Sequence, residues 1–199
     1  MRKQKRRPDP SLKIPASQKA KWVARWSKST KKFSWPQHKK RKLNQWFLPD
    51  LKAQTDAHCS YCDGYPVEGL SLETIDHFKP KAQEEFRQFA FEWGNLFYCC
   101  SWCQKEKGER FCSLLLKPDD SDYEFGVYFY PDYTKGEILP HPDLSTPDRE
   151  RVEKTIEILN LNSDSHTENR RLELNKWMDS SQLDIDKYAY RFFLPEHLV

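Results

Sequence analysis

Two pairs of cysteines share a spacing that suits metal binding. Cys59-Ser-Tyr-Cys62 and Cys100-Ser-Trp-Cys103 are both C-x-x-C pairs, and each pair with its turn, here called a knuckle, can present two thiolates on one side. Together the four sulfurs complete a tetrahedral zinc site, which is structural because four thiolates leave no open position. The alternative is that some of these residues are buried free thiols or a redox pair. The repeated spacing favours zinc.

The other cysteines and the histidines do not fit this spacing. Cys99 and Cys112 are interpreted as ordinary buried thiols. His58 adjoins the first knuckle, but the set of four cysteine ligands is complete without it. We expect Tyr61 and Trp102, inside the knuckles, to pack against the zinc turns. The remaining histidines have no partners at ligand spacing and are expected on the surface: His38, His141, His166 and His197.

A second group of polar residues lies between the knuckles and just after them. Asp76 and His77 are adjacent, and Asn95 precedes the second knuckle. Gln104 follows that knuckle directly, and Lys107 comes three residues later. A lone Asp-His pair is more often a pair of surface groups. Composition does not explain an acid, an imidazole and two amides gathered around a zinc knuckle.

These residues carry a resemblance to a known family. IDHFKPK followed by NLFYCCSWCQKEKG resembles the HNH endonucleases, whose ββα-metal motif lies within a two-knuckle zinc site, and the similarity covers about residues 59–110. A narrower resemblance over most of residues 59–175 is to the PtuB-type HNH nucleases, which accompany an ATPase in Septu antiphage systems and in some retrons. It adds the phrases YCDGYP, FEWGNLFYCC and TIEILNLNS. The basic N-terminus matches neither.

The resemblance implies a role for each residue. His77 would be the general base that takes a proton from the attacking water, since an imidazole is available in its neutral form near pH 7. Asp76 would help to hold a catalytic Mg²⁺ or Mn²⁺ at the scissile phosphate, and Asn95 would fix the imidazole. Gln104 stands where the family has a His or Asn as second metal ligand, so its amide oxygen lies one methylene further out than that of Asn. Two flanking lysines would contact nucleic-acid phosphates, namely Lys79 and Lys107.

The elements that must position these residues follow from the apolar pattern. A strand through Leu72 and Ile75 is expected to end in Asp76 and His77, with the break at Pro80, and a strand end is a good place to present an acid and an imidazole together. In the last helix, Leu172 and Trp177 are expected in the core. Other expected elements are a short helix from about residue 17, one or two helices over 34–59 broken near Pro49, strands over 123–130 and 137–139, and helices over 146–159 and 165–178.

The chain of 199 residues fits one compact domain with appendages. We divide it into a basic N-terminal arm with a short helix (1–42), an HNH nuclease core with zinc knuckles (43–120), and a hairpin and helical C-terminal extension (121–199). The expected fold class is α+β, with a ββα-metal HNH core and structural zinc flanked by N-terminal and C-terminal helices.

The net charge of +3 conceals an uneven distribution. Residues 1–42 hold 16 Lys/Arg and one acid, whereas the rest holds 17 Lys/Arg and 29 Asp/Glu. The first fifteen residues, with three prolines, are expected to be extended or poorly ordered alone. So basic a segment seeks a polyanion, of which nucleic acid is the most obvious. An anionic membrane surface, an acidic protein partner and a merely solubilising tail are the alternatives.

Three functional hypotheses follow. The first is a metal-dependent HNH endonuclease that cleaves DNA, with RNA as the alternative substrate, as an antiphage effector beside an ATPase partner and, in a retron, a reverse transcriptase with its nucleic acid. The rival hypothesis is a non-catalytic, zinc-stabilised nucleic-acid-binding module. It stays open because Gln104 departs from the His or Asn of the family's metal site. The third is an adaptor whose C-terminal helices dock on an ATPase. No apolar run approaches the ~20 residues of a membrane helix and no secretory signal is visible, so we expect no membrane association and a cytoplasmic location.

Overall fold

The computed structural model describes residues 1–180 and 184–195. Within these ranges the fold is mixed α+β, with three two-stranded antiparallel sheets, which confirms the predicted class at this level. The strands are β1 (Gln37–His38), β2 (Arg41–Lys42), β3 (Glu73–His77), β4 (Leu96–Cys100), β5 (Phe129–Asp132) and β6 (Glu137–Pro140). The α-helices are α1 (Ala16–Ser27), α2 (Leu43–Gln54), α3 (Val67–Leu70), α4 (Ser101–Lys107), α5 (Phe125–Tyr128), α6 (Thr146–Leu159) and α7 (Asp164–Met178). The 3-10 helices are η1 (Pro10–Lys13), η2 (Glu84–Phe89), η3 (Trp93–Asn95), η4 (Ile185–Lys187) and η5 (Arg191–Phe193).

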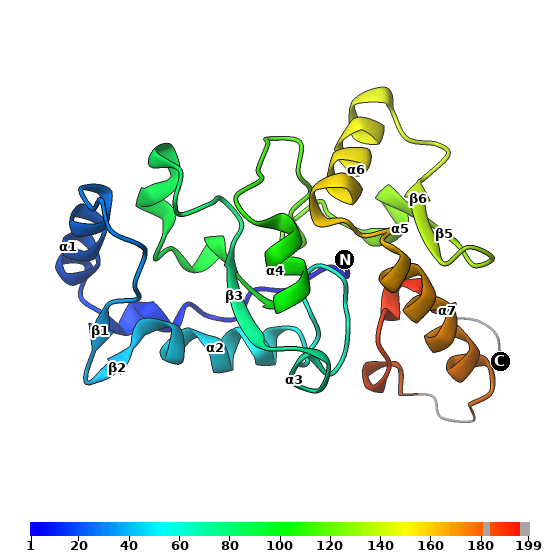
Figure 1. The fold of residues 1–199 in the computed structure, drawn as a ribbon, viewed down its shortest axis with the longest axis horizontal. Helices are drawn as coiled ribbons and strands as arrows, with labels where there is room; N and C mark the ends of the chain where they lie inside the picture. The colour runs from blue at the N-terminus through cyan, green and yellow to red at the C-terminus, as the bar shows by residue number, and fades with distance from the viewer. Residues whose placement is uncertain (181–183, 196–199) are drawn as a thin grey trace.

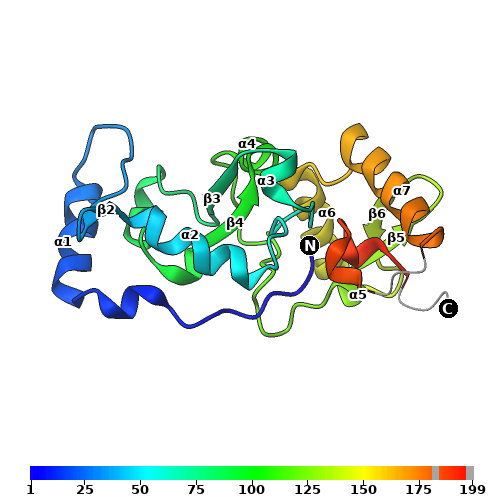
Figure 2. The ribbon, with the colours of Figure 1, turned by 90° about the horizontal axis from the view of Figure 1, so that it is seen from below.

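The molecule is elongated, with α1 at one end, α7 at the other and the N-terminus near the middle (Figures 1 and 2). Figure 1 shows α1, β1 and β2 at one end, β3 and α4 in the middle, and α5 to α7 with the β5–β6 hairpin at the other end, and Figure 2 shows β4 beside β3. Among the helices of the described part of the chain, none is long and apolar enough to cross a membrane.

The central unit is a ββα arrangement. β3 and β4 pair antiparallel, with Glu73 opposite Cys100 and His77 opposite Leu96. All five residues of β4 are buried, and α4 begins directly after β4 and packs against both strands. The predicted strand ending in Asp76 and His77 is confirmed, and it begins at Glu73 rather than at the exposed Leu72.

The segment before this unit differs from the prediction of helices broken near Pro49. Residues 37–42 form the β1–β2 hairpin, whose turn places Lys39 and Lys40 at positive φ. The helix α2 then runs through Pro49 unbroken. Proline frees the carbonyl four residues earlier, and here Arg41 Nη2 donates to that carbonyl, Gln45 O, at 3.4 Å. Burial of one apolar face holds the helix together, through Leu43, Phe47 and Leu51.

The C-terminal region has the predicted hairpin and two helices, with local differences. Residues 125–128, predicted as strand, form the short helix α5, in which Tyr128 stacks on Tyr123 with ring centroids 5.8 Å apart. Helix α6 is capped by Ser145, which accepts from Asp148 N–H. Leu172, expected in the core, is 49% exposed, since α7 instead buries His166 and Arg170.

The first nine residues are packed against the body of the protein. They run extended beneath α2 (Figure 2), and Met1 is fully buried, with its carbonyl accepting from Tyr123 Oη. Four cations of this segment pair with acids of the body: Arg2 with Asp186, Lys3 with Glu124, Arg6 with Asp119, and Arg7 with Asp50. Part of the arm's charge is therefore used within the chain.

Candidate metal centre and catalytic cluster

The two knuckles come together as predicted. The Sγ atoms of Cys59, Cys62, Cys100 and Cys103 lie within 4.8 Å of one another, and all four residues are buried. The Cys62 and Cys100 sulfurs are 3.9 Å apart. A tetrahedral zinc ion with Zn–S bonds of about 2.3 Å separates its sulfurs by about 3.8 Å. The cluster can therefore hold a metal ion such as zinc.

Backbone amides stabilise negative charge on these sulfurs. Cys103 N–H donates to Cys100 Sγ, Cys100 N–H to Cys59 Sγ, and Gly64 N–H to Cys62 Sγ, each at 3.4 Å. Contact with the Cys100 sulfur raises the pKa of the Cys62 and Cys103 thiols, whereas the neighbouring thiols lower the pKa of Cys100. The protein alone thus favours one thiolate over four. A bound cation makes four thiolates compatible.

Two predictions about residues near the cluster, those for His166 and Trp102, are wrong. His166, expected on the surface, is buried with Nε2 4.0 Å from Cys103 Sγ. Trp102 is 44% exposed rather than packed, while Tyr61 is buried as expected. His58 is excluded as a ligand because both ring nitrogens contact backbone carbonyls, with Nε2 2.9 Å from Tyr188 O. Cys99 is buried and Cys112 half-buried, and His197 lies outside the described residues.

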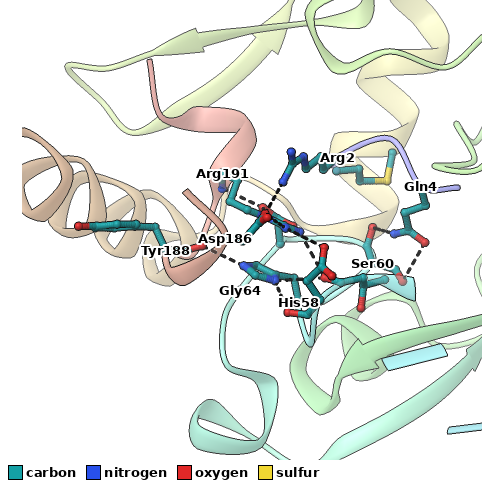
Figure 3. Close-up of polar contacts among 12 residues, drawn as sticks. Arg2, Gln4, His58, Ser60, Gly64, Asp186, Tyr188 and Arg191 are labelled. Carbon is teal, nitrogen blue, oxygen red and sulfur yellow. Dashed lines mark hydrogen bonds and ion pairs between the residues drawn. The ribbon is translucent and has the colours of Figure 1, made fainter. Parts of the chain in front are cut away.

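The C-terminal segment is fastened onto the first knuckle, which the sequence did not reveal. The Arg191 guanidinium contacts both carboxylate oxygens of Asp63, the residue after Cys62, at 2.8 and 3.1 Å, and its backbone N–H donates to the same carboxylate. Arg191 also contacts Asp186, which Arg2 reaches from the N-terminus (Figure 3). Nearby, Gln4 and Ser60 exchange two hydrogen bonds (Figure 3). Both ends of the chain thereby stabilise the knuckle.

His77 is the last residue of β3, and its ring is enclosed. Trp35 stacks on the imidazole with centroids 5.2 Å apart, and Phe33 meets it edge-on at 5.3 Å. Nε2 lies 3.0 Å from Ala90 O, whereas the buried Nδ1 has no hydrogen-bond partner among the described residues. Burial lowers the pKa of His77 well below its ordinary value, so the imidazole is neutral at pH 7. The bond to a carbonyl requires the proton on Nε2, which leaves a lone pair on Nδ1.

Asp76 is buried and already has two donors. Tyr61 Oη donates to Asp76 Oδ2 at 2.7 Å, and Lys107 Nζ lies 3.0 Å from the same oxygen. Lys107 also donates to His77 O at 2.8 Å. Burial raises the pKa of Asp76, and the Lys107 ammonium opposes that shift. The Lys107 side chain is fully buried in this structure, and its contact with phosphate stays a prediction.

The two amide residues act on the backbone around this pair. Asn95 Oδ1 accepts from Lys79 N–H at 2.7 Å, and Nδ2 donates to Lys79 O and Phe89 O, both at 3.1 Å. Asn95 thus ties down the loop that carries Ala90, the partner of His77, and contacts the imidazole only through it. Gln104 Nε2 donates to Ile75 O at 3.0 Å, one residue before Asp76.

Lys79, the other lysine predicted to contact phosphate, is only half-buried. Its ammonium lies over the Phe89 ring, 4.7 Å from the centroid. The structure therefore joins the Lys107 ammonium to the Asp76 carboxylate and to the backbone carbonyl of His77, and Asn95 and Gln104 bond to the neighbouring backbone.

Comparison with known proteins identifies no family for this chain. Neither the protein-family models nor the curated proteins contain a match to this sequence. The structure itself establishes a mixed α+β chain with a buried four-cysteine cluster fit for a metal ion such as zinc.

Proposed function

We propose that this protein is an HNH-type, metal-dependent endonuclease that cleaves phosphodiester bonds in DNA. The observation that carries the proposal is His77. Its neutral imidazole is held by Ala90 O through Nε2, while Nδ1 has no partner among the described residues. A buried polar atom without a partner calls for an explanation, and a catalytic role is one such explanation. The His77 residue stands at the end of the first strand of a ββα unit beside a four-cysteine cluster.

In this proposal His77 Nδ1 accepts the proton of the attacking water. Asn95 is a positioning residue, because it fixes the loop carbonyl that sets the tautomer and the ring orientation. The Phe33 and Trp35 rings exclude bulk water from the imidazole. Substrate reaches Nδ1 only when the segment that carries these rings moves.

Mg²⁺ or Mn²⁺ fits the neighbouring donor set in its chemistry. Both contacts of Asp76 fall on Oδ2, and Gln104 uses its amide nitrogen, so Asp76 Oδ1 and Gln104 Oε1 are the oxygens that would hold the ion. When bound, such an ion offsets the charge that develops on the phosphate. The Lys107 ammonium competes for the same carboxylate.

That competition supports a second candidate, a zinc-stabilised nucleic-acid-binding protein without catalysis. A permanent Asp76–Lys107 pair would serve as a structural ion pair at the end of α4. The wider context, an antiphage effector or adaptor with an ATPase or reverse-transcriptase partner, rests on the motif resemblance alone, and co-purification with the product of an adjacent gene would test it.

A cleavage assay separates the two candidates. The full chain, loaded with zinc, is incubated with plasmid, single-stranded DNA and RNA in the presence of Mg²⁺ or Mn²⁺. His77→Ala is compared with His141→Ala, a half-exposed histidine of a surface loop, as the matched control. We expect DNA cleavage by the parent and by His141→Ala and a loss of about 100-fold or more in His77→Ala. Equal cleavage by all three, or none with binding retained, would contradict the nuclease proposal.

A further inference from the structure

A cavity lined by aromatic rings opens beside α1. Helix α1 lies at the end of the molecule away from α7 (Figure 1). Its volume is about 490 Å³, and its apolar walls are formed by Trp22, Trp26, Trp35 and Phe91. Trp22 and Trp26 are four residues apart and so share one face of α1. This volume is typical of small-ligand sites and admits an unpaired nucleobase with its sugar, but not a base pair within a duplex.

The rim of this cavity is positively charged. Arg25, Lys31 and Lys32 line it, their side chains are exposed, and no lining residue is acidic. None of the three forms an ion pair with an acid of residues 1–180 or 184–195, in contrast to the arm's cations at positions 2, 3, 6 and 7. Of the aromatic walls, Trp22, Trp26 and Phe91 are buried and Trp35 is half-buried, so Trp35 is the ring that can accept a stacked base. Cations around such a cavity match a phosphate backbone with exposed bases.

The cavity adjoins the candidate catalytic residue through one shared ring. Trp35 lines the cavity and also stacks on the His77 imidazole, with an interplanar angle of 26°. A ligand in the cavity is therefore separated from His77 by a single aromatic side chain. Helix α1 is held in place by η2, and Arg87 of η2 lies over the Trp26 ring and donates to Ser27 O.

We infer that this cavity binds single-stranded DNA, with one unpaired base among the tryptophans and the flanking phosphates on Arg25, Lys31 and Lys32. The choice of DNA rests on the proposed function, whereas the requirement for an unpaired base follows from the cavity. A base in a duplex has both faces stacked and cannot offer one to a tryptophan. The basic arm thereby delivers a single strand to the His77 end of the ββα unit.

Binding is tested without cleavage, by fluorescence anisotropy of a labelled oligothymidylate, its matched duplex and the RNA equivalent, with no divalent cation added. The double variant Lys31→Gln/Lys32→Gln is compared with Lys39→Gln/Lys40→Gln, which removes the same charge from the β1–β2 turn outside the cavity. We expect single-stranded DNA to bind more tightly than the duplex, and the first variant to weaken it about 10-fold more than the second. Equal losses, or a preference for duplex or RNA, would overturn the inference.

Trp35→Leu tests the stacking step. Loss of one stacked base is expected to weaken single-strand binding by about 5- to 150-fold, with circular dichroism to verify folding. Because Trp35 also packs on His77, a second measurement reports position directly: oligonucleotides carrying 5-bromodeoxyuridine are photocrosslinked and the attached peptides identified. Crosslinks to Trp22, Trp26 or Trp35 support the site, and crosslinks confined to other peptides refute it. If the protein binds single-stranded DNA but cleaves no substrate, only the nuclease proposal is contradicted. If it cleaves duplex DNA but does not bind single strands, only the present inference is contradicted.

Discussion

The ion pair between Arg191 and Asp63 allows a stability prediction from the structure. Their side chains are 4% and 3% exposed, and Arg191 reaches both carboxylate oxygens. Removing one partner of such a buried pair leaves the other charge uncompensated, at a cost of about 3–5 kcal/mol. That is a large part of the total of about 5–15 kcal/mol expected for a domain. For a chain of this size each kcal/mol lowers Tm by about 2–4 °C, so Arg191→Met should lower Tm by roughly 6–20 °C.

Thermal and urea unfolding of the zinc-loaded protein measure this effect. The matched control is Arg171→Met, which removes an exposed arginine paired with Glu168 and should cost about 0–1 kcal/mol. Adding Asp63→Asn to Arg191→Met should recover part of the loss, since no charge is then stranded. Because Asp63 follows Cys62, Arg191→Met should also release zinc faster to a chromogenic chelator. Equal costs for Arg191→Met and Arg171→Met would refute the view that the C-terminal segment fastens the knuckle.

Three further predictions concern the centre of the molecule. Cys103→Ser should lose the metal and unfold the ββα unit, while Cys112→Ser should keep both, as metal analysis and circular dichroism would show; a stable, metal-free Cys103→Ser contradicts this. Because folding lowers the pKa of His77, the unfolded chain takes up a proton below about pH 6.5 that the fold excludes. Stability should therefore fall below that pH by up to about 1.4 kcal/mol per unit, and His77→Gln should flatten this dependence in urea titrations. Lys107→Met should destabilise by about 3–5 kcal/mol, and Asp76→Asn in the same chain should restore part of it; an unchanged midpoint would exclude a stabilising Asp76–Lys107 pair.

Local signals allowed the metal centre and the strand end to be predicted. The C-x-x-C spacing is a property of neighbouring residues, so all four cysteines were identified, and Pro80 marked the end of the strand that presents Asp76 and His77. The burial of Lys107 could also have been predicted from the sequence. Lys107 follows Cys103 by four residues and therefore shares its helix face, and a zinc ligand must face inward.

Long-range contacts could not be predicted. Arg191 and Asp63 are 128 residues apart, and His166 approaches Cys103 across 63 residues. No local pattern encodes such pairs, because each side chain alone is typical of an exposed residue. The unbroken helix through Pro49 has the same origin, since tertiary burial and a guanidinium from the preceding hairpin compensate for the lost backbone bond.

Whether a charged side chain is free to bind a ligand depends on whether it is already paired within the protein. The arm's first seven residues neutralise acids of the body, whereas the cations at the aromatic cavity have no such partner among the described residues.

The partner of Asp76 likewise bears on its function. The Asp76 carboxylate holds the Lys107 ammonium 3.0 Å from Oδ2 and leaves Oδ1 open to a divalent cation, and the two cations would repel each other at this close range. In a nuclease Lys107 therefore weakens the binding of the ion for as long as it stays beside Asp76, whereas in a binding module the pair serves as a permanent structural contact. Lys107→Met removes the competitor, so it tightens Mn²⁺ binding only if Asp76 is a cation ligand.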